Sequence, residues 1–193
     1  MADMTGKFIL VIGPSGSGKG TLIGHIRPLF PILVYPRSTT TRAMRASEKD
    51  GEHYYFISAD QFMTKAHAGE FLEWAEYGGH LYGTLRSEVM PILEAGKVAL
   101  KELEVQGARQ VREKLPREAL AIIFVNAGAW DEMEQRIKAR APISDEELSR
   151  RKERYEDEMS FMAEADYVVE NHSGSVEEAK KNFEGIVRSI LGS

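Results

Sequence analysis

The chain has 193 residues, of which 42% are hydrophobic and 28% are charged, a composition typical of a globular protein with one sizeable core. It contains no cysteine, which excludes disulfides and thiolate metal sites, and its formal net charge of −5 argues against a broad nucleic-acid-binding surface. No apolar run approaches the ~18 residues of a membrane span, and the N-terminus lacks the apolar segment of a signal peptide. We therefore expect a cytoplasmic protein that acts on small molecules and binds neither nucleic acid nor membranes.

Apolar runs and helical patterns alternate along most of the chain. Short apolar runs bounded by turn residues predict strands of one sheet at 7–12, 32–35, 98–103, 119–125 and 167–169. Helical patterns predict helices at 21–29, 105–115, 130–140 and 176–191. Because strands that alternate with helices usually pair in parallel, the pattern indicates an α/β fold with a mostly parallel sheet flanked by helices.

A glycine-rich loop, GPSGSGKGT at 13–21, follows the first predicted strand and opens into the first helix. This is the context of a phosphate-binding P-loop, because glycines let backbone N–H groups turn inward and a helix N-terminus attracts anions. Lys19 is then placed to reach the outer phosphates of a nucleotide. Gly20 replaces the Ser or Thr that usually meets Mg²⁺, so we expect Thr21 or a water molecule in that role. The alternative is a glycine-rich turn without a ligand.

Residues 38 to about 90 interrupt the alternation with a polar, aromatic and turn-rich segment. Short strands at 54–57, 71–77 and 80–82 predict an inserted subdomain with its own small antiparallel sheet. Arg42 and Arg45 follow a run of hydroxyl residues, and two guanidinium groups so placed form a fork for a phosphate. Tyr54 and Tyr82 can add phenolic donors to the same anion. Taken alone, the two arginines would be interpreted as an exposed surface pair.

Glu73 and Thr84 lie on either side of a Gly78-Gly79 turn. A carboxylate accepts two hydrogen bonds side by side, which suits the N1–H and N2–H₂ donors of guanine, and a hydroxyl can donate to guanine O6. Adenine presents an acceptor at N1, so a site of this kind rejects it by ~10⁴-fold or more when its polar groups are buried. Without further signals, Glu73 would be interpreted as a solvated carboxylate on a strand.

Together these segments resemble the guanylate kinase family over nearly the whole chain. The loop at 13–21 is similar to the family's ATP-binding loop, and STTTRAMR at 38–45 is similar to its S-x-T-T-R-x-x-R signature for GMP. Further similar segments are DGEHYYF at 50–56, EFLE at 70–73, LYGT at 81–84 and ELEVQG at 102–107. The resemblance implies a P-loop nucleoside monophosphate kinase fold with inserted GMP-binding and lid subdomains. It also implies Mg²⁺-dependent transfer of the ATP γ-phosphoryl group to GMP, which gives ADP and GDP.

The resemblance also implies roles for single residues. Guanine contacts are implied for Ser38, Glu73, Thr84 and Glu104, and GMP phosphate contacts for Arg42, Arg45, Tyr54 and Tyr82. ATP contacts are implied for Ser15, Gly16, Ser17, Gly18, Lys19, Gly20 and Thr21, with Asn171 against the adenine. Thr21 and Glu102 would lie near Mg²⁺. The groups expected to stabilise the transferring phosphoryl group are Lys19 and the lid arginines Arg136, Arg140 and Arg151.

The lid assignment falls on a dense run of charge from about 136 to 159, which on composition alone predicts a solvated helix. The implied division of the chain is a P-loop core at 1–37, a GMP-binding subdomain at 38–91, core at 92–128, lid at 129–159 and core at 160–193. Four positions depart from the family pattern. Glu102 and Glu104 stand where Asp is commoner, His172 stands where Asp is common, and Pro142 replaces a small flexible residue.

Three other interpretations are open. A kinase for ribose 1,5-bisphosphate has a similar P-loop core but does not need base contacts from Glu73 and Thr84. A non-catalytic guanylate-kinase-like interaction module typically lacks the P-loop lysine, whereas Lys19 is present here. An unrelated nucleoside monophosphate kinase can share Gly-Lys-Gly-Thr without the S-x-T-T-R-x-x-R signature.

Overall fold

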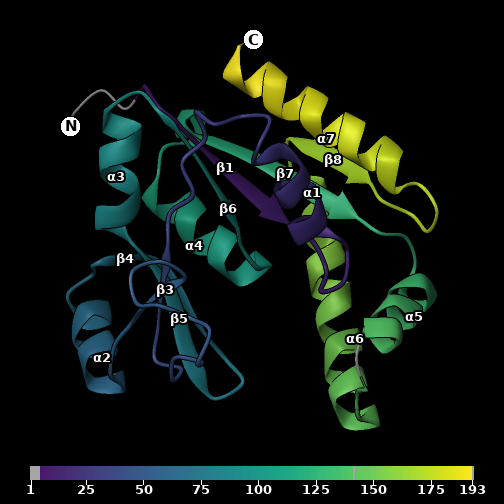
Figure 1. Cartoon of the computed structure of the whole chain (residues 1–193), viewed down its shortest axis with the longest axis horizontal. Coiled ribbons are helices and arrows are strands. Elements are labelled where there is room, and N and C mark those ends of the chain that lie inside the picture. The colour runs from purple at the N-terminus through teal and green to yellow at the C-terminus, as the bar shows by residue number, and fades with distance from the viewer. Residues whose placement is uncertain (1–4, 141, 193) are drawn as a thin grey trace. The chain divides into compact units, whose positions relative to one another are not determined.

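The computed structural model describes residues 5–140 and 142–192, in which strands and helices alternate (Figure 1). The strands are β1 (Lys7–Ile12), β2 (Ser38–Thr40), β3 (Tyr54–Phe56), β4 (Phe71–Tyr77), β5 (His80–Leu85), β6 (Val98–Glu102), β7 (Leu120–Asn126) and β8 (Tyr167–Glu170). The helices are α1 (Lys19–Ile26), α2 (Ala59–His67), α3 (Arg86–Glu94), α4 (Val105–Lys114), α5 (Trp130–Arg140), α6 (Asp145–Ser160) and α7 (Val176–Leu191), with the 3₁₀ turns η1 (Arg117–Ala119) and η2 (Phe161–Glu164). The predicted α/β class is confirmed. In the part of the chain that is described, no helix combines the length and the apolar character needed to cross a bilayer.

Two four-stranded sheets have the strand orders β6-β1-β7-β8 and β3-β2-β5-β4. The chain divides into two compact units. The first unit contains residues 5–8, 33–101 and 106–120, and the second contains 9–32, 102–105, 121–140 and 142–192. The P-loop therefore belongs to the second unit, and the inserted segment with its own sheet belongs to the first.

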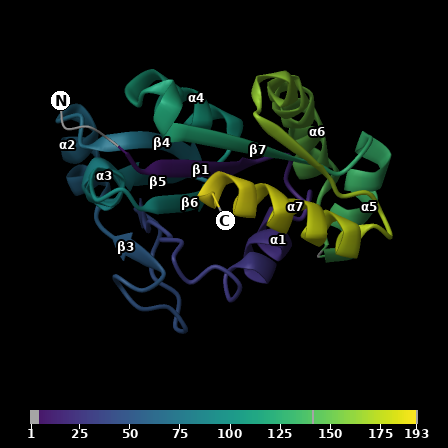
Figure 2. The ribbon, with the colours of Figure 1, turned by 90° about the horizontal axis from the view of Figure 1, so that it is seen from above.

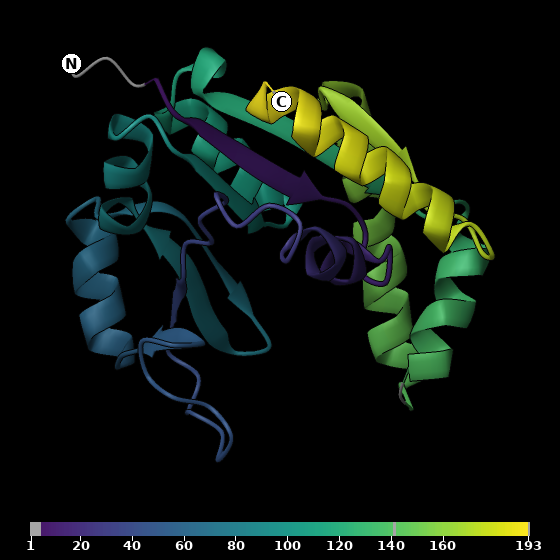
Figure 3. The same ribbon diagram turned by 45° about the horizontal axis from the view of Figure 1, so that its top comes forward.

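The core of the second unit is built on the buried parts of β1 and β7. Residues 9–12 of β1 and 121–125 of β7 are all buried, as expected for strands covered on both faces. β7 pairs in parallel with β8, from Ile123 opposite Tyr167 to Asn126 opposite Glu170. Around these strands α1 packs against α7, and α5 packs against α6 (Figure 3).

The sheet of the first unit is mixed, which corrects the prediction of a purely antiparallel one. β2 pairs antiparallel with β5 and β5 antiparallel with β4, but β2 and β3 run in parallel. The parallel pair is possible because the long segment between β2 and β3, drawn as an extended loop beside β3 in Figure 2, brings the chain back to run in the same direction. On this unit Phe62 of α2 stacks on Phe71 of β4, with ring centroids 4.4 Å apart.

A tight turn fixes the register of the β4–β5 hairpin. Gly78 and Gly79 have φ values of 58° and 77°, a left-handed pair that two-residue hairpin loops favour. From this turn the register runs without interruption to Glu73 opposite Thr84. The expectation that these two residues flank the turn is therefore confirmed, and they are cross-strand neighbours.

Other boundaries differ from the sequence predictions for local reasons. The expected strand at 32–35 is reduced to an isolated bridge between Val34 and Ala99, because Pro31 and Pro36 flank it and have no N–H to continue a ladder. Helices α2 and α3 were not predicted. A capping box, in which Ser58 and Gln61 each accept from the other's backbone N–H, starts α2, and α3 contains a proline. The solvated helix expected in the charged run from about 136 to 159 corresponds to α6, which the Ser144 side chain caps, while the start of that run belongs to α5.

Candidate functional site

The phosphate-binding loop of the second unit connects β1 to α1. Gly13 has a φ of 146°, and a Cβ atom there would lie 2.4 Å from the carbonyl oxygen of Val125. No other residue fits without moving the backbone of β7, so the first glycine of the loop is a packing requirement. α1 begins directly at Lys19, which places the loop amides at a helix N-terminus.

Lys19 lies folded into this loop. Its side chain is buried, and Nζ donates hydrogen bonds to the carbonyl oxygens of Gly13 at 2.6 Å and of Pro14 at 3.1 Å. The Glu102 carboxylate lies 3.6 Å from the same Nζ and is half exposed. Gly20 and Thr21 are exposed at the start of α1, and a Cβ atom on Gly20 would lie 4.0 Å from Glu102 Oε2. The Lys19 ammonium group and the Glu102 carboxylate therefore lie together at one edge of the loop.

A cavity of about 500 Å³ opens beside the loop in the same unit. The loop, α5, α6 and the connection between these two helices line it, through Ser15, Gly16, Ile137, Pro142, Ile143, Ser144, Glu147 and Arg151. Arg151 Nη1 donates to Ser15 Oγ at 3.2 Å, and its Nε donates to Glu147 at 3.0 Å. Arg151 of α6 therefore contacts the loop between β1 and α1. The Arg140 side chain lies outside the described part of the structure.

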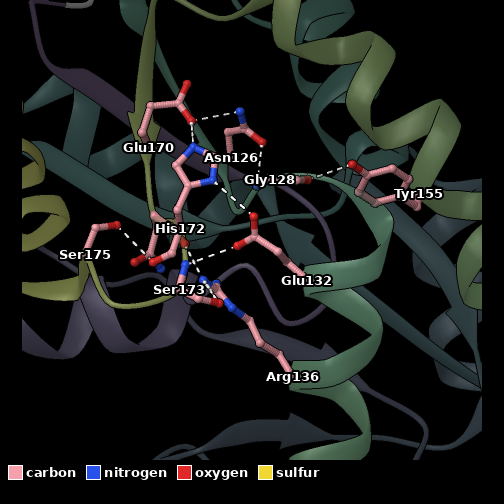
Figure 4. Close-up of polar contacts among 10 residues, drawn as sticks. Asn126, Gly128, Glu132, Arg136, Tyr155, Glu170, His172, Ser173 and Ser175 are labelled. Atoms are coloured by element: carbon pink, nitrogen blue, oxygen red, sulfur yellow. Dashed lines mark hydrogen bonds and ion pairs between the residues drawn. The ribbon is translucent and has the colours of Figure 1, made fainter.

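Arg136 is engaged differently from Arg151. Its Nη2 donates to the backbone carbonyl of Asn171 at 2.7 Å, and Ser173 Oγ lies 3.5 Å away. Next to it, His172 lies between two carboxylates, with Nε2 3.0 Å from Glu170 and Nδ1 3.7 Å from Glu132 (Figure 4). Tyr155 of α6 donates to the Gly128 carbonyl at 2.7 Å at the edge of this network.

Glu158 of α6 is a perturbed acid that the sequence did not single out. Burial raises the pKa of its carboxyl group to about 7, with the charge of Glu104 acting in the same direction and that of Lys19 opposing it. The Ser15 backbone N–H also interacts with this carboxylate and lowers its pKa. Carboxyl groups whose pKa is raised in this way are typical of functional sites, and this one lies beside a loop that attracts anions.

In the first unit, Glu73 and Thr84 form a buried polar pair. Glu73 is 7% exposed and Thr84 is fully buried, and the Thr84 hydroxyl donates a short hydrogen bond to Glu73 Oε1. Burial raises the pKa of Glu73, and the Thr84 hydrogen bond and the charge of Lys101 oppose this shift. A Cβ on Gly107 of α4 would lie 3.0 Å from Glu73 Oε2, so this glycine leaves room for the carboxylate.

Lys101 is a buried cation near this pair. It is 8% exposed, and its Nζ donates to the Pro36 carbonyl at 3.0 Å. Burial lowers the pKa of Lys101 to about 8, although the charges of Glu73 and Glu88 work against that shift. Sequence reasoning missed it because a lysine inside an apolar strand pattern carries no motif.

Glu48, which the sequence did not single out, positions Arg42 of the predicted phosphate fork. Arg42 makes a bidentate pair with Glu48, and the guanidinium lies 5.6 Å from the centroids of the Tyr54 and Phe56 rings. Tyr54 and Tyr82 meet edge to face at 6.2 Å. Arg45 is exposed, and Ser38 begins the neighbouring strand β2.

The candidate residues thus form two groups. The first unit brings together Ser38, Arg42, Arg45, Tyr54, Glu73, Tyr82 and Thr84. The second unit holds the loop residues, Glu102, Arg136, Arg140, Arg151 and Asn171, and it also contains Glu104, which is exposed.

The family model described as "Guanylate kinase" matches residues 5–190. The chain belongs to the guanylate kinase family. It is 43% identical to the guanylate kinase of Trichormus variabilis over 167 residues, 86% of this chain and 83% of that protein. It is 40% identical to the guanylate kinase of Thermosynechococcus vestitus over 166 residues, 86% of each chain. Among solved structures, the crystal structure of guanylate kinase from Anaplasma phagocytophilum matches with a TM-score of 0.70 at 26% identity, covering 97% of this chain and 87% of that one.

Membership of the guanylate kinase family confirms the resemblance and the P-loop kinase fold inferred from sequence. Guanylate kinases transfer a phosphoryl group from ATP to GMP. Sequence motifs located most of these side chains. They did not locate Glu48, Lys101 or Glu158, because no motif marks these residues and their shifted pKa values arise from their surroundings in the fold.

Proposed function

We propose that this protein phosphorylates GMP from ATP through the residues of the two groups. The observation that carries the proposal is the buried pair of Glu73 and Thr84. A carboxylate held in place by a hydroxyl, with its other oxygen beside a glycine, is suited to accept the two adjacent donors of guanine. Adenine presents an acceptor at N1 where guanine presents a donor, so this buried carboxylate would lose a hydrogen bond and face a repelling lone pair, which is how such a site excludes adenine.

The rest of the GMP site follows from the same unit. Ser38 and Thr84 add hydroxyls for the base, and the family resemblance implies a further base contact for Glu104. Arg42 and Arg45 would bind the phosphate, because guanidinium groups match its oxygens in pairs, and Tyr54 and Tyr82 would donate to the same group. We assign this role to the segment 38–91.

For ATP we propose the P-loop from Ser15 to Thr21 as the phosphate site, with Lys19 at the outer phosphates. Arg151, which already contacts Ser15, and Arg136 and Arg140 would close the segment 129–159 over the triphosphate as a lid. The remaining segments, 1–37, 92–128 and 160–193, form the proposed core. We further propose that the enzyme works in the cytoplasm, where both nucleotides are available.

The donor set at the edge of the loop fits a magnesium ion. Glu102 offers a half-exposed carboxylate 3.6 Å from Lys19, and Thr21 offers an exposed hydroxyl, both of them the hard oxygen ligands that Mg²⁺ prefers. We propose these two residues as its holders, directly or through water. When bound with ATP, the ion neutralises part of the phosphate charge.

The reaction places few chemical demands on the side chains. The acceptor is a phosphate oxygen that is already ionised near neutral pH, so no general base is needed. The difficulty is electrostatic, since two polyanions must meet and their charge is redistributed during transfer. Lys19, the loop amides and the lid arginines supply the compensating charge, while Arg42 and Arg45 orient the acceptor.

A coupled assay of ADP formation tests the proposal, with GMP, AMP, UMP, CMP and ribose 1,5-bisphosphate offered separately as acceptors. We expect turnover with GMP and at most trace turnover with the others. Turnover with ribose 1,5-bisphosphate instead would identify the sugar-phosphate kinase. Binding of ATP without turnover on any acceptor would favour a binding module and overturn the proposed reaction.

A further inference from the structure

Asn171 connects the end of the sheet to the phosphate-binding loop. It directly follows β8, and its backbone N–H donates to the carbonyl of Asn126 at the end of β7 at 2.7 Å. Its side chain is 4% exposed, and Nδ2 donates to the Ser17 carbonyl in the middle of the loop at 2.7 Å. The amide is thus used inside the protein and presents almost no surface to a ligand.

The loop is shaped to accept this amide. Gly18 has a φ of 96°, and a Cβ atom there would lie 2.3 Å from Asn171 Nδ2. The backbone conformation and the close approach both require glycine at this position. Packing and hydrogen bonding therefore show independently that Asn171 and the loop are matched to each other.

A second set of contacts fixes the backbone that carries Asn171. Arg136 holds the Asn171 carbonyl at 2.7 Å, and Glu132 accepts the backbone N–H of Ser173 at 3.1 Å. His172 is held between Glu132 and Glu170, and Asn126 donates to Glu170 at 2.9 Å (Figure 4). The side chain of Asn171 consequently projects from a restrained segment and can impose its position on the loop.

The peptide geometry converts this contact into an effect on phosphate binding. In a trans peptide the C=O and the following N–H point to opposite sides. When Asn171 holds the Ser17 carbonyl, the N–H of Gly18 is directed away from Asn171, and Lys19 follows at the next residue. An amide orientation that is fixed in advance does not have to be organised when a phosphate binds.

We propose that Asn171 is a positioning residue that orients the P-loop for phosphate, whatever base the nucleotide carries. This inference rests on the proposed function only in that the loop binds the ATP phosphates. It differs from the contact with adenine that the family resemblance implies for this residue. The two roles make opposite predictions for ligands that lack adenine.

The test measures binding of ATP, GTP and inorganic tripolyphosphate to the wild type and to Asn171→Asp by calorimetry. Aspartate has nearly the same shape, but it replaces the donor by an oxygen that the Ser17 carbonyl repels. We expect all three affinities to fall by about tenfold or more, with the ATP to GTP ratio unchanged. Ser173→Ala, in the same segment, is the matched control and should leave the three affinities within about twofold.

All affinities are measured well below the unfolding temperature of each variant, so that a loss of folded protein is not counted as a loss of binding. If Asp is not tolerated, Asn171→Ser removes the same contact without adding charge and is judged by the same ligands. A loss confined to ATP, with tripolyphosphate binding unchanged, would overturn the inference in favour of an adenine contact. Unchanged affinities for all three ligands would also overturn it, as would a wild type that binds ATP but not tripolyphosphate. A protein that binds tripolyphosphate as expected but does not phosphorylate GMP would contradict the proposed function and leave this inference standing.

Discussion

Arg42 and Glu48 are joined by two parallel hydrogen bonds, from Nη1 to Oε2 at 3.0 Å and from Nη2 to Oε1 at 2.7 Å. The backbone N–H of Arg45 donates to the same carboxylate at 2.8 Å. The Arg42 hydrogen bonds, and then that of Arg45, lower the pKa of Glu48 to about 2. Glu48 therefore stays ionised at any pH near neutrality and links the two arginines that we assign to the GMP phosphate.

We predict that Glu48→Gln raises the KM for GMP by roughly tenfold and leaves the KM for ATP within about twofold, because a neutral amide no longer fixes the guanidinium plane. Steady-state kinetics with each substrate varied in turn provide the measurement. Glu52→Gln, an exposed partner of Lys49 on the same segment, is the control. A lower KM for GMP would show that Glu48 competes with the phosphate instead of orienting Arg42.

The base-recognition role that we propose for Glu73 predicts a selective loss on Glu73→Gln. The new amide N–H₂ would face guanine donors, so kcat/KM for GMP should fall by about 10²-fold or more while ATP binding changes little. Glu76→Gln is a matched control, since Glu76 lies on the same strand β4 and is exposed. Equal losses for both nucleotides would remove Glu73 from the guanine site.

Lys101 predicts a pH dependence of stability. Burial lowers its folded-state pKa from 10.5 to about 8, so between these values the unfolded chain binds more protons than the folded one. Through this group the free energy of unfolding therefore rises with pH over that window, by at most about 3 kcal/mol. Lys101→Met lacks this rise. From pH 8 to 10.5 the free energy of unfolding of the wild type should therefore increase relative to that of the variant.

Denaturant unfolding at a series of pH values measures this difference. Lys97→Met, at an exposed position just before β6, should give a curve parallel to the wild type. The groups that face Lys101, Glu73 from β4 and Glu88 from α3, are present in all three proteins. If the Lys101→Met curve were also parallel, Lys101 would not be a buried titrating cation.

The electrostatic mechanism predicts that Lys19→Ala and Arg151→Ala each lower kcat by roughly 10²-fold or more with the fold intact. Arg150→Ala is the neighbouring control, because its side chain is more than half exposed and pairs along the helix with Glu146 and Glu147. Circular dichroism and thermal unfolding check the fold. A fall in kcat of less than threefold would exclude the residue concerned from the transfer step.

Features set by local sequence could be predicted, and features set by distant packing could not. The bounds of β1, α5 and α7 match the predicted 7–12, 130–140 and 176–191, because hydrophobic periodicity is read within each segment. The P-loop was recognisable because its glycines are required by backbone geometry. α3 was missed because Pro91 lies inside it, where proline normally argues against a helix.

The site shows the same division. Glu73 and Thr84 could be paired from the sequence because a two-glycine turn connects their strands. Lys101 and Glu158 could not be placed, because their altered pKa values arise from burial and from charges far away along the chain. The hydrogen bond from Asn171 to Ser17 likewise could not be predicted, because the two residues are 154 positions apart and the sequence around each gives no sign of the other.

The uninterrupted register from the Gly78-Gly79 turn to Glu73 and Thr84 has a consequence for comparing related sequences. If one residue added near the turn were taken up by the strand pairing, Thr84 would shift by a single place against β4 and its hydroxyl would point to the other face of the sheet. Every recognition residue would still be present, and a motif search would still find each of them. The spacing between these two strands is therefore as informative about base selectivity as the side chains themselves.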